Sequence, residues 1–463
     1  MASEAAAPRR WWAPRAWLAD GWHEHVLLEA GADGRWLAVT PGVHAAPADT
    51  AVLAGPVLPG LVDAHGHAFQ RAFAGLAERR DGEHDDFWSW RDRMYAVALR
   101  VSPDDLRAIA AHLYVELVRG GYTHVCEFHY LHHAPDGTRY ADPMTLSWAL
   151  ADAAADAGIG LTLLPVLYQR AGFAQPQLRP DQRRFATGAD DVLAMQRAAA
   201  ASGRPLLNAG VALHSLRACT PEAIARVVER CGDVPVHVHA AEQTAEVDDC
   251  LAATGQRPVQ WLAQRGGLDA RWQVVHATHV TRAEIDAVAR AGAGIVLCPS
   301  TEANLGDGLT DLPAWLDAGV PVAIGSDSHV TRGWREELRL ADYGQRLVQR
   351  RRNVCAAPSA GEPSTAARLW RSALAGGGRA AGFARWGLQA GARADLLVVD
   401  THDASLLGVP AAQLLDALVF SSPGRPWRDV MIAGRWVVQS HRHAGSDSIA
   451  RAFAQRVEAL WTA

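Results

Sequence analysis

Lysine is absent from this chain of 463 residues, so all 45 basic side chains are arginine. Schiff-base enzymes, phosphate-binding loops of the Walker A type and lysine-bridged two-metal hydrolases each need a lysine nitrogen, and the sequence excludes all three. Arginine keeps its charge at any ordinary pH and presents a planar set of donors. A site that binds anions in this protein therefore has to use arginine side chains or backbone N–H groups.

Cysteine and long apolar runs are also scarce. The six cysteines are scattered and include no C-x-x-C pair, which argues against a disulfide framework and a zinc–thiolate site. No window approaches the ~18 consecutive apolar residues of a membrane span. The N-terminus reaches Trp11 and Trp12 without the roughly 7–15-residue apolar stretch of an export signal. We therefore expect a cytoplasmic protein with no membrane span.

The charge of the chain is nearly balanced. With 45 basic and 50 acidic residues the net charge is −5, which disfavours nucleic acid as the main partner. Apolar residues make up 49% of the chain and charged residues 21%, as in folded globular proteins. We expect a sizeable core and a small-molecule partner.

Short apolar or β-branched runs alternate with longer segments of helical periodicity. Eight such runs follow residue 56, and most are continuously apolar, which is typical of a parallel sheet covered by helices. Eight β/α units are the number that closes a (β/α)8 barrel, so the predicted fold is an α/β barrel of the TIM type. The eight runs span residues 57–65, 122–130, 160–168, 210–215, 234–239, 273–276, 294–299 and 320–327.

Both ends of the chain have a different character. Beyond Gly376-Gly377-Gly378, strand patterns occur at residues 394–400 and 430–438, and a similar pattern lies near the N-terminus at residues 35–40. We expect a small β-sandwich domain built from residues 1–55 and 385–463. The catalytic barrel then spans residues 56–384.

Residues with metal-binding chemistry occur where several predicted strands end. The first strand ends in His65-Gly66-His67, and residues two apart in a strand point to the same side, so both imidazoles can reach one metal ion. A single H-x-H pair is more often incidental. Strand ends of a parallel barrel, however, meet at one rim, and histidines that merely fill a core would scatter over depth and face. The rim also receives His239, Glu242, His276 and Asp327.

Three further histidines have more than one reading. His237 is two residues before His239, on the same face but one layer deeper, and fits a buried hydrogen-bonded residue. His279 and His329 follow their strand ends, where a supporting role or a loop position is equally consistent. The sequence leaves the roles of all three open.

Several blocks resemble the amidohydrolase superfamily, in particular its mononuclear deaminase branch. They are residues 59–67 (PGLVDAHGH), His239 with Glu242 three residues later, His276, and residues 325–327 (GSD). Residues 387–400 (GLQAGARADLLVVD) are similar to the return of that superfamily to its small β domain. This likeness implies a metal, usually zinc, held by His65, His67, His239 and Asp327. An N/O site of this kind also accepts iron or manganese.

A narrower resemblance is to the deiminases that act on N-formimino-L-glutamate in histidine degradation. It rests on residues 67–76 (HAFQRAFAGL), 87–91 (FWSWR), 127–130 (EFHY), 214–217 (HSLR) and 300–308 (STEANLGDG). The resemblance implies hydrolysis to N-formyl-L-glutamate and ammonia by a homodimer. Asp327 would accept the proton of water, Glu242 would carry one to the leaving nitrogen, and His276 would orient the attacked group. The implied contacts to the dicarboxylate substrate are Gln70, Arg91, Tyr130, His214 and Arg217.

Two alternatives stay open at this point. One is a deaminase of another amidine or of a heterocycle such as guanine, cytosine or a triazine, with the same metal site and a different pocket. The other is a scaffold that kept the barrel and lost its activity. The sequence keeps all the expected metal ligands and the expected proton carrier Glu242. This argues against a scaffold, because a binding protein does not need a residue that carries protons.

Overall fold

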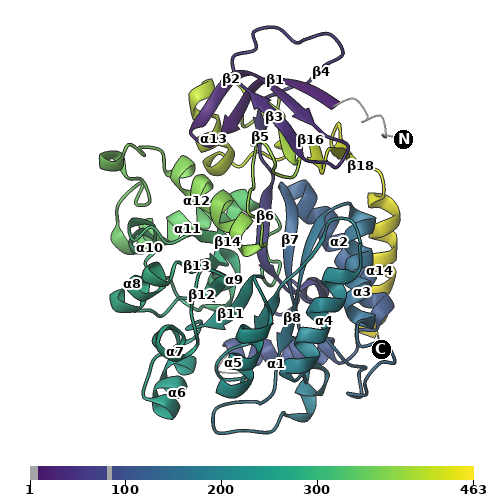
Figure 1. Cartoon of the computed structure of the whole chain (residues 1–463), viewed down its shortest axis with the longest axis vertical. Coiled ribbons are helices and arrows are strands. Elements are labelled where there is room, and N and C mark those ends of the chain that lie inside the picture. The colour runs from purple at the N-terminus through teal and green to yellow at the C-terminus, as the bar shows by residue number, and fades with distance from the viewer. Residues whose placement is uncertain (1–8, 81–85, 463) are drawn as a thin grey trace.

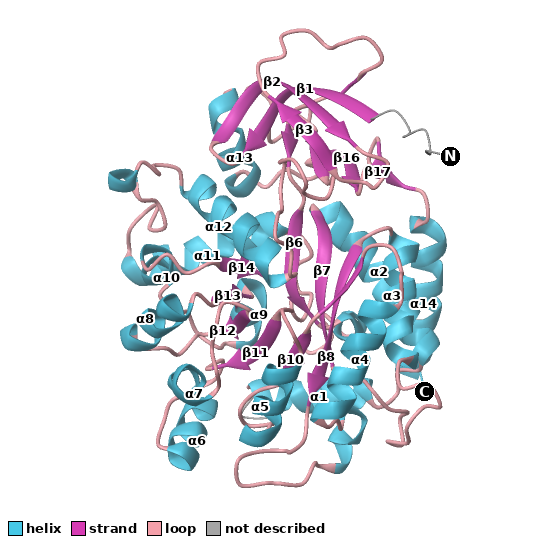
Figure 2. Ribbon diagram, in the orientation of Figure 1, coloured by secondary structure: helices cyan, strands magenta, loops and turns pink. Residues whose placement is uncertain are grey.

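A parallel barrel forms the centre of the protein, whose computed structural model describes residues 9–80 and 86–462 (Figures 1 and 2). Eight strands follow the order β14-β13-β12-β11-β10-β8-β7-β6, and the short β9 (Leu207–Ala209) pairs with β8. The predicted (β/α)8 architecture is confirmed. The barrel strands are β6 (Leu61–Gly66), β7 (Tyr122–His129), β8 (Gly160–Leu167), β10 (Val211–Leu213), β11 (Val236–Ala240), β12 (Trp272–His276), β13 (Gly294–Leu297) and β14 (Val322–Ile324).

The first and last strands close the barrel just beyond the end of β14. The Asp327 N–H donates to the His65 carbonyl at 3.0 Å, and the His67 N–H donates to the Asp327 carbonyl at 3.2 Å. Gly325 permits this approach, because a Cβ there would lie 2.7 Å from the Cβ of His65. Three side chains expected to bind metal are therefore positioned by the hydrogen bonds that close the barrel.

Helices cover the outside of the barrel, and their ends follow local sequence signals. In α2 (Pro103–Gly120), Ser102 caps the N-terminus together with Asp105, and Gly121 ends the helix with a φ of 95°. The other helices around the barrel are α3 (Thr145–Ala157), α4 (Ala189–Ala201), α5 (Pro221–Arg230), α6 (Thr244–Thr254), α7 (Pro258–Arg265), α8 (Arg282–Ala291), α9 (Pro299–Leu305), α10 (Leu312–Asp317), α11 (Trp334–Gln349) and α12 (Thr365–Ala380).

The three glycines at residues 376–378 lie inside α12 rather than after it. A Cβ on Gly376 would lie 2.6 Å from the Val322 carbonyl oxygen, and one on Gly378 would lie 2.6 Å from the Cβ of Trp386. The helix therefore tolerates three poor helix formers because they let it pack directly on the barrel strands and on Trp386. The helical periodicity of residues 363–375 predicts an earlier end, whereas the helix continues to Ala380.

A second sheet joins the two ends of the chain. It is one hydrogen-bonded sheet of nine strands, in which β4 branches from β1. The strand predicted at residues 57–65 is divided, because Val57 and Leu58 pair with β1 and β15 in this sheet while the barrel strand begins at Leu61. The strands are β1 (Arg9–Leu18), β2 (Gly21–Ala30), β3 (Trp36–Thr40), β4 (Ala51–Val52), β5 (Val57–Leu58), β15 (Leu396–Val399), β16 (Trp427–Ile432), β17 (Arg435–Gln439) and β18 (Arg442–His443).

The last helix, α14 (Ser446–Thr462), lies beside α2 of the barrel and away from the small sheet (Figure 1). The Trp461 indole N–H donates to the Ala72 carbonyl at 3.2 Å, and Arg100 donates to the Leu460 carbonyl at 2.9 Å. This position differs from the predicted assignment of residues 446–463 to the small domain. Amphipathic periodicity alone does not indicate which surface a helix covers.

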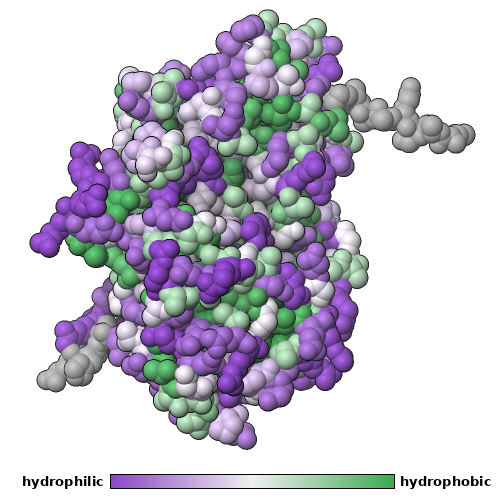
Figure 3. Space-filling model, turned by 60° about the vertical axis from the view of Figure 1, so that its left-hand side comes forward, coloured by the Kyte–Doolittle hydropathy of each residue, from purple (hydrophilic) through white to green (hydrophobic). Residues whose placement is uncertain are grey.

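The remaining elements connect these parts. In Figure 1 the small sheet lies at the top and α1 at the opposite end of the barrel. On the face shown in Figure 3, hydrophilic residues separate small hydrophobic patches. Within the described ranges, no helix is long and apolar enough to cross a membrane. The connecting elements are α1 (Phe87–Ala98), α13 (Leu414–Phe420), and the 3₁₀ helices η1 (Ala68–Ala72), η2 (Pro180–Phe185), η3 (Pro358–Ala360) and η4 (Ala411–Gln413).

Candidate active site

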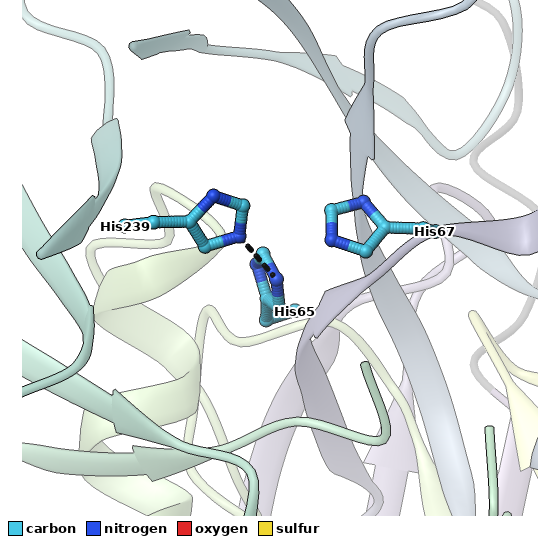
Figure 4. Close-up of side chains that lie close together, drawn as sticks. All are labelled: His65, His67 and His239. Carbon is cyan, nitrogen blue, oxygen red and sulfur yellow. Dashed lines mark hydrogen bonds between the residues drawn. The ribbon is translucent and has the colours of Figure 1, made fainter. Parts of the chain in front are cut away.

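Three histidines converge at the C-terminal end of the barrel. His65 and His67 come from β6 and the residue after it, and His239 comes from β11. Their ligand atoms all lie within 4.8 Å of one another, and the Nε2 atoms of His65 and His239 are 3.0 Å apart. Figure 4 shows His239 and His67 facing each other with His65 below them. The side chains are buried, so their donor atoms share a site that is shielded from water.

Backbone carbonyl groups orient two of these rings. His67 Nδ1 lies 2.9 Å from the Phe128 carbonyl oxygen, and His239 Nδ1 lies 3.0 Å from the His214 carbonyl oxygen. Each Nδ1 then carries the hydrogen, which leaves the Nε2 lone pair directed into the site. His65 Nε2 lies 3.0 Å from His239 Nε2, a separation at which a hydrogen shared between the two nitrogens joins the rings. Burial also lowers the pKa of His65 to about 3, so this ring is neutral and able to bind a metal.

Asp327 completes this group of donors. Its Oδ1 lies 3.5 Å from His65 Nε2 and 3.3 Å from His67 Nε2. Burial alone would raise its pKa, but the neighbouring His65 and His67 rings hold the pKa of Asp327 well below the ordinary value. Asp327 also has a φ of 49°, an uncommon conformation for this residue that the closing hydrogen bonds of the barrel maintain. Three imidazoles and one carboxylate are a donor set that suits a divalent metal ion.

Glu242 and His276 lie on the other side of Asp327. His276 Nε2 is 3.6 Å from Glu242 Oε1 and 3.8 Å from Asp327 Oδ2. Burial raises the pKa of Glu242 to about 7 against the opposing effect of His276. Burial opposes the charged form of His276, but Glu242, Glu302 and Asp327 outweigh it and raise the pKa of His276 to about 10. A carboxyl group with a pKa near neutrality is well suited to accept and release protons.

Two glutamates that the sequence analysis did not single out as site residues also belong to this region. Glu302 Oε1 lies 3.3 Å from His276 Nδ1, and Glu246 Oε2 accepts the Glu242 backbone N–H at 3.0 Å. Glu302 follows Pro299 on the first turn of α9, and Glu246 is four residues after Glu242 on α6. Their positions shortly after a strand end indicate that both lie near the rim, but not that their carboxylates face the site.

Arg91 and Arg217 provide positive charge in the same cavity. Among the described residues, Arg217 has no carboxylate within 4 Å, and Arg91 has only the exposed Asp92 at 3.9 Å. The Arg91 Nε is buried without a hydrogen-bond partner. Both guanidinium groups lie over the ring of Trp88, at 4.4 Å for Arg91 and 5.9 Å for Arg217. Burial and the nearby Arg217 lower the pKa of Arg91, although it stays a cation. Two cations without a strong internal partner suit an anionic ligand.

The other expected substrate contacts line this cavity as well. Gln70 donates from Nε2 to the Tyr130 hydroxyl at 2.9 Å, while its Oε1 is buried without a partner. The His214 ring lies 4.4 Å from that of Tyr168. One cavity is thus lined by the residues expected to bind substrate and by most of those expected to bind metal or carry protons. His65 lies beneath this cavity. Its lining includes His67, Gln70, Arg91, Tyr130, His214, Arg217, His239, Glu242, Glu246, His276 and Asp327.

The three histidines whose roles the sequence left open do not line the cavity. His237 Nε2 lies 2.9 Å from the Ala380 carbonyl oxygen of α12, and His279 Nε2 lies 2.8 Å from the Asp307 carbonyl oxygen. His329 Nδ1 lies 2.9 Å from the Ser326 hydroxyl. His237 and His279 therefore connect separate parts of the barrel, whereas the His329 contact lies within one loop.

Comparisons with known proteins agree with this arrangement. The profile of the Amidohydrolase family matches residues 57–437. A formimidoylglutamate deiminase of Pseudomonas aeruginosa is 48% identical, covering 96% of this chain and 97% of its own. The crystal structure of an amidohydrolase from Brucella melitensis is 41% identical with a TM-score of 0.92, covering 98% and 100% of the two chains.

A more distant solved structure has the same fold. It is an adenosine deaminase from Xanthomonas campestris with bound zinc, 24% identical with a TM-score of 0.79 and covering 99% of both chains. Enzymes of the Amidohydrolase family are metal-dependent, and His65, His67 and His239 of this chain form a group that could hold a metal ion. The match of the family profile over most of the sequence, together with the barrel and its histidines, establishes that this chain belongs to the amidohydrolase family.

Proposed function

We propose that this protein hydrolyses N-formimino-L-glutamate to N-formyl-L-glutamate and ammonia, a reaction of histidine degradation. The observation that carries the proposal is the presence of two arginines, Arg91 and Arg217, in one cavity with the histidine cluster. Neither has a close internal carboxylate partner within the described part of the chain, and the proposed substrate carries two carboxylates. The 48% identity to the Pseudomonas aeruginosa formimidoylglutamate deiminase supports the same substrate.

The contacts of the proposed substrate follow from charge. Arginine binds carboxylates through paired, charge-assisted hydrogen bonds, and the chain has no lysine that could replace it. Arg91 and Arg217 would each hold one carboxylate, and the unpartnered Gln70 Oε1 can accept an N–H of the substrate. Tyr130 and His214 would complete the walls around the bound molecule.

The chain would move protons through three side chains. Asp327 would accept a proton from water, because its carboxylate lies between the histidine cluster and His276. Glu242 would carry a proton to the nitrogen that leaves as ammonia, and its pKa of about 7 supports this role. His276 would hold the formimino group through Nε2. The formimino carbon gains an oxygen from water and loses its C–N bond to the departing nitrogen.

The donors of His65, His67, His239 and Asp327 would hold one divalent metal, and we propose zinc. A bound cation at such a site activates water and stabilises negative charge that develops on the reacting group. Elemental analysis of purified active protein is expected to find one zinc per chain. Two metals per chain, or active protein without any, would contradict the assignment.

Product analysis tests the proposed reaction. Purified, metal-loaded protein is incubated with N-formimino-L-glutamate, and ammonia and the organic product are both measured. Ammonia with N-formyl-L-glutamate is expected. Formamide with free glutamate would instead indicate cleavage of the other C–N bond. Turnover of guanine, cytosine or a triazine in preference to N-formimino-L-glutamate would replace the proposed substrate.

Further features of the enzyme are also proposals. We propose a homodimer, which analytical ultracentrifugation would test, and a cytoplasmic location, which the six unpaired buried cysteines support. We also propose residues 56–384 as the catalytic unit.

A further inference from the structure

His276 is held between acidic groups on both sides of its ring. Its Nε2 faces Glu242 at 3.6 Å and Asp327 at 3.8 Å, and its Nδ1 faces Glu302 Oε1 at 3.3 Å. His276 is 1% exposed and Glu302 is 5% exposed, so water does not compete for this contact. The backbone of His276 has a φ of 68°, so the side chain leaves a strained position at the end of β12.

Glu302 is itself held firmly. Its Oε1 accepts the Cys298 backbone N–H at 2.9 Å, and its own N–H donates to the Cys298 carbonyl at 2.9 Å. Within the described residues, His276 is the one basic side chain within 4 Å of the Glu302 carboxylate. Glu302 does not line the cavity, so it has no direct access to a bound substrate.

We propose that Glu302 is a positioning residue that accepts the Nδ1 hydrogen of His276 and thereby directs Nε2 toward the reacting group. This inference rests on the proposed function, because His276 acts there through Nε2. Without a fixed acceptor the ring can turn over, which takes Nε2 out of the cavity. A buried carboxylate behind a histidine prevents this rotation.

The test replaces Glu302 with Gln in the metal-loaded protein and measures ammonia release from N-formimino-L-glutamate. The change keeps the size of the side chain and removes its charge. We expect kcat to fall roughly 10–100-fold while KM, metal content and the melting temperature stay close to wild type. Glu302→Asp should recover part of the lost kcat. An unchanged kcat in Glu302→Gln would overturn the inference.

Glu337→Gln is the matched control. Glu337 is fully buried and also binds α9, since it accepts the Ser300 N–H at 2.9 Å and the Ser300 hydroxyl at 2.6 Å, but it does not contact His276. If Glu302 only stabilised α9, both Gln variants would lower kcat alike. We expect kcat of Glu337→Gln to stay within about threefold of wild type.

A double-mutant cycle tests whether Glu302 acts through His276. In a His276→Asn background, Glu302→Gln should change kcat by less than about twofold, because no imidazole is left to orient. An equal loss in both backgrounds would show that Glu302 acts independently of His276.

A measurement without substrate separates this inference from the proposed function. The zinc-loaded protein should show a low-field proton resonance from the His276 Nδ1 hydrogen, which disappears in His276→Asn and is lost or shifted in Glu302→Gln. It should persist in Glu337→Gln. A protein that shows this pattern but releases no ammonia would disprove the proposed reaction and leave the contact established. A wild type without the resonance would disprove the contact.

Discussion

Glu242 is the residue whose surroundings best match a proton carrier. Its pKa is raised to about 7, mainly by burial, and it lies 3.6 Å from His276 without belonging to the metal-binding group. Glu242→Gln keeps the shape of the side chain and removes the carboxyl group that can accept and release a proton. We therefore expect kcat to fall by roughly 10²–10⁴-fold. Metal content should equal that of wild type, because all four proposed ligands stay in place. A variant with nearly normal turnover would assign the proton path to another residue, with His276 the next candidate.

Arg91 and Arg217, the proposed carboxylate contacts, belong to the same scale. A hydrogen bond to a charged group contributes ~1.5–3 kcal/mol, so Arg→Met at either position should lower kcat/KM for N-formimino-L-glutamate by roughly 10–200-fold. The control is a formimino compound that lacks one carboxylate. The variant that has lost the matching arginine should process this compound almost as well as wild type does, because the missing contact is absent from both. Normal kinetics in both variants would contradict the assignment of these arginines and narrow the claim to an unspecified deaminase.

The candidate metal-binding and proton-carrying residues could be predicted from the sequence because the strand ends of a parallel barrel meet at one rim. His65, His239, His276 and Asp327 could therefore be grouped although more than 250 residues separate the first from the last. The contact of Glu302 with His276 was not predicted, because it depends on the direction in which α9 leaves the barrel. A spacing pattern in one strand does not contain that direction.

At the scale of elements, α1 brings two parts of the cavity together. The half-buried Trp88 on this helix lies under Arg91 of the same helix and Arg217 from the loop after β10. The aromatic face offsets part of the repulsion between the two guanidinium groups. We expect Trp88→Leu to raise KM by roughly 3–30-fold and leave kcat within about twofold, since each cation–π contact contributes ~0.5–2 kcal/mol.

Trp90→Leu is the comparison for this prediction. Trp90 lies on the same helix and its ring packs near Phe73 at 5.6 Å, and no described guanidinium lies over that ring. A smaller rise in KM is expected for it. Because Trp90 also lines the cavity, equal effects of the two substitutions would mean that the aromatic wall and packing of α1, rather than the cation–π contacts, support substrate binding.

Other elements show where local patterns reach their limit. The start and stop signals of the sequence predict a helix over residues 103–120, which is α2, because the caps Ser102 and Gly121 act within one helical turn. The glycines at residues 376–378 predict the end of a helix but lie inside α12. Their close packing on Val322 and Trp386 depends on distant parts of the chain. The hairpin of β1 and β2 was not predicted either. Its register pairs Trp17 with Trp22 across a two-residue turn, and tryptophan-rich segments without regular alternation give a weak strand signal.

At the scale of the whole molecule, buried carboxyl groups make stability depend on pH. Glu337 is fully buried, accepts hydrogen bonds from Ser300 and Thr331, and burial raises its pKa to about 7 from an ordinary value of 4.5. Because the folded pKa lies above the unfolded one, the folded state binds the proton more tightly. The resulting stabilisation is complete below pH 4.5 and is lost as the pH rises through about 7.

Glu337→Gln isolates this effect, because the amide resembles the protonated carboxyl group and does not titrate. Between pH 5 and pH 8 we expect the free energy of unfolding of wild type to fall by roughly 2–3 kcal/mol relative to the variant. Urea titrations of both proteins at each pH measure the difference, and contributions from the proposed metal site cancel because its residues are the same in both proteins. A constant difference across this range would mean that Glu337 is ionised in the folded protein, with its charge stabilised by the Ser300 and Thr331 hydrogen bonds. A relative gain in wild-type stability with rising pH would reverse the sign and place the folded pKa below 4.5.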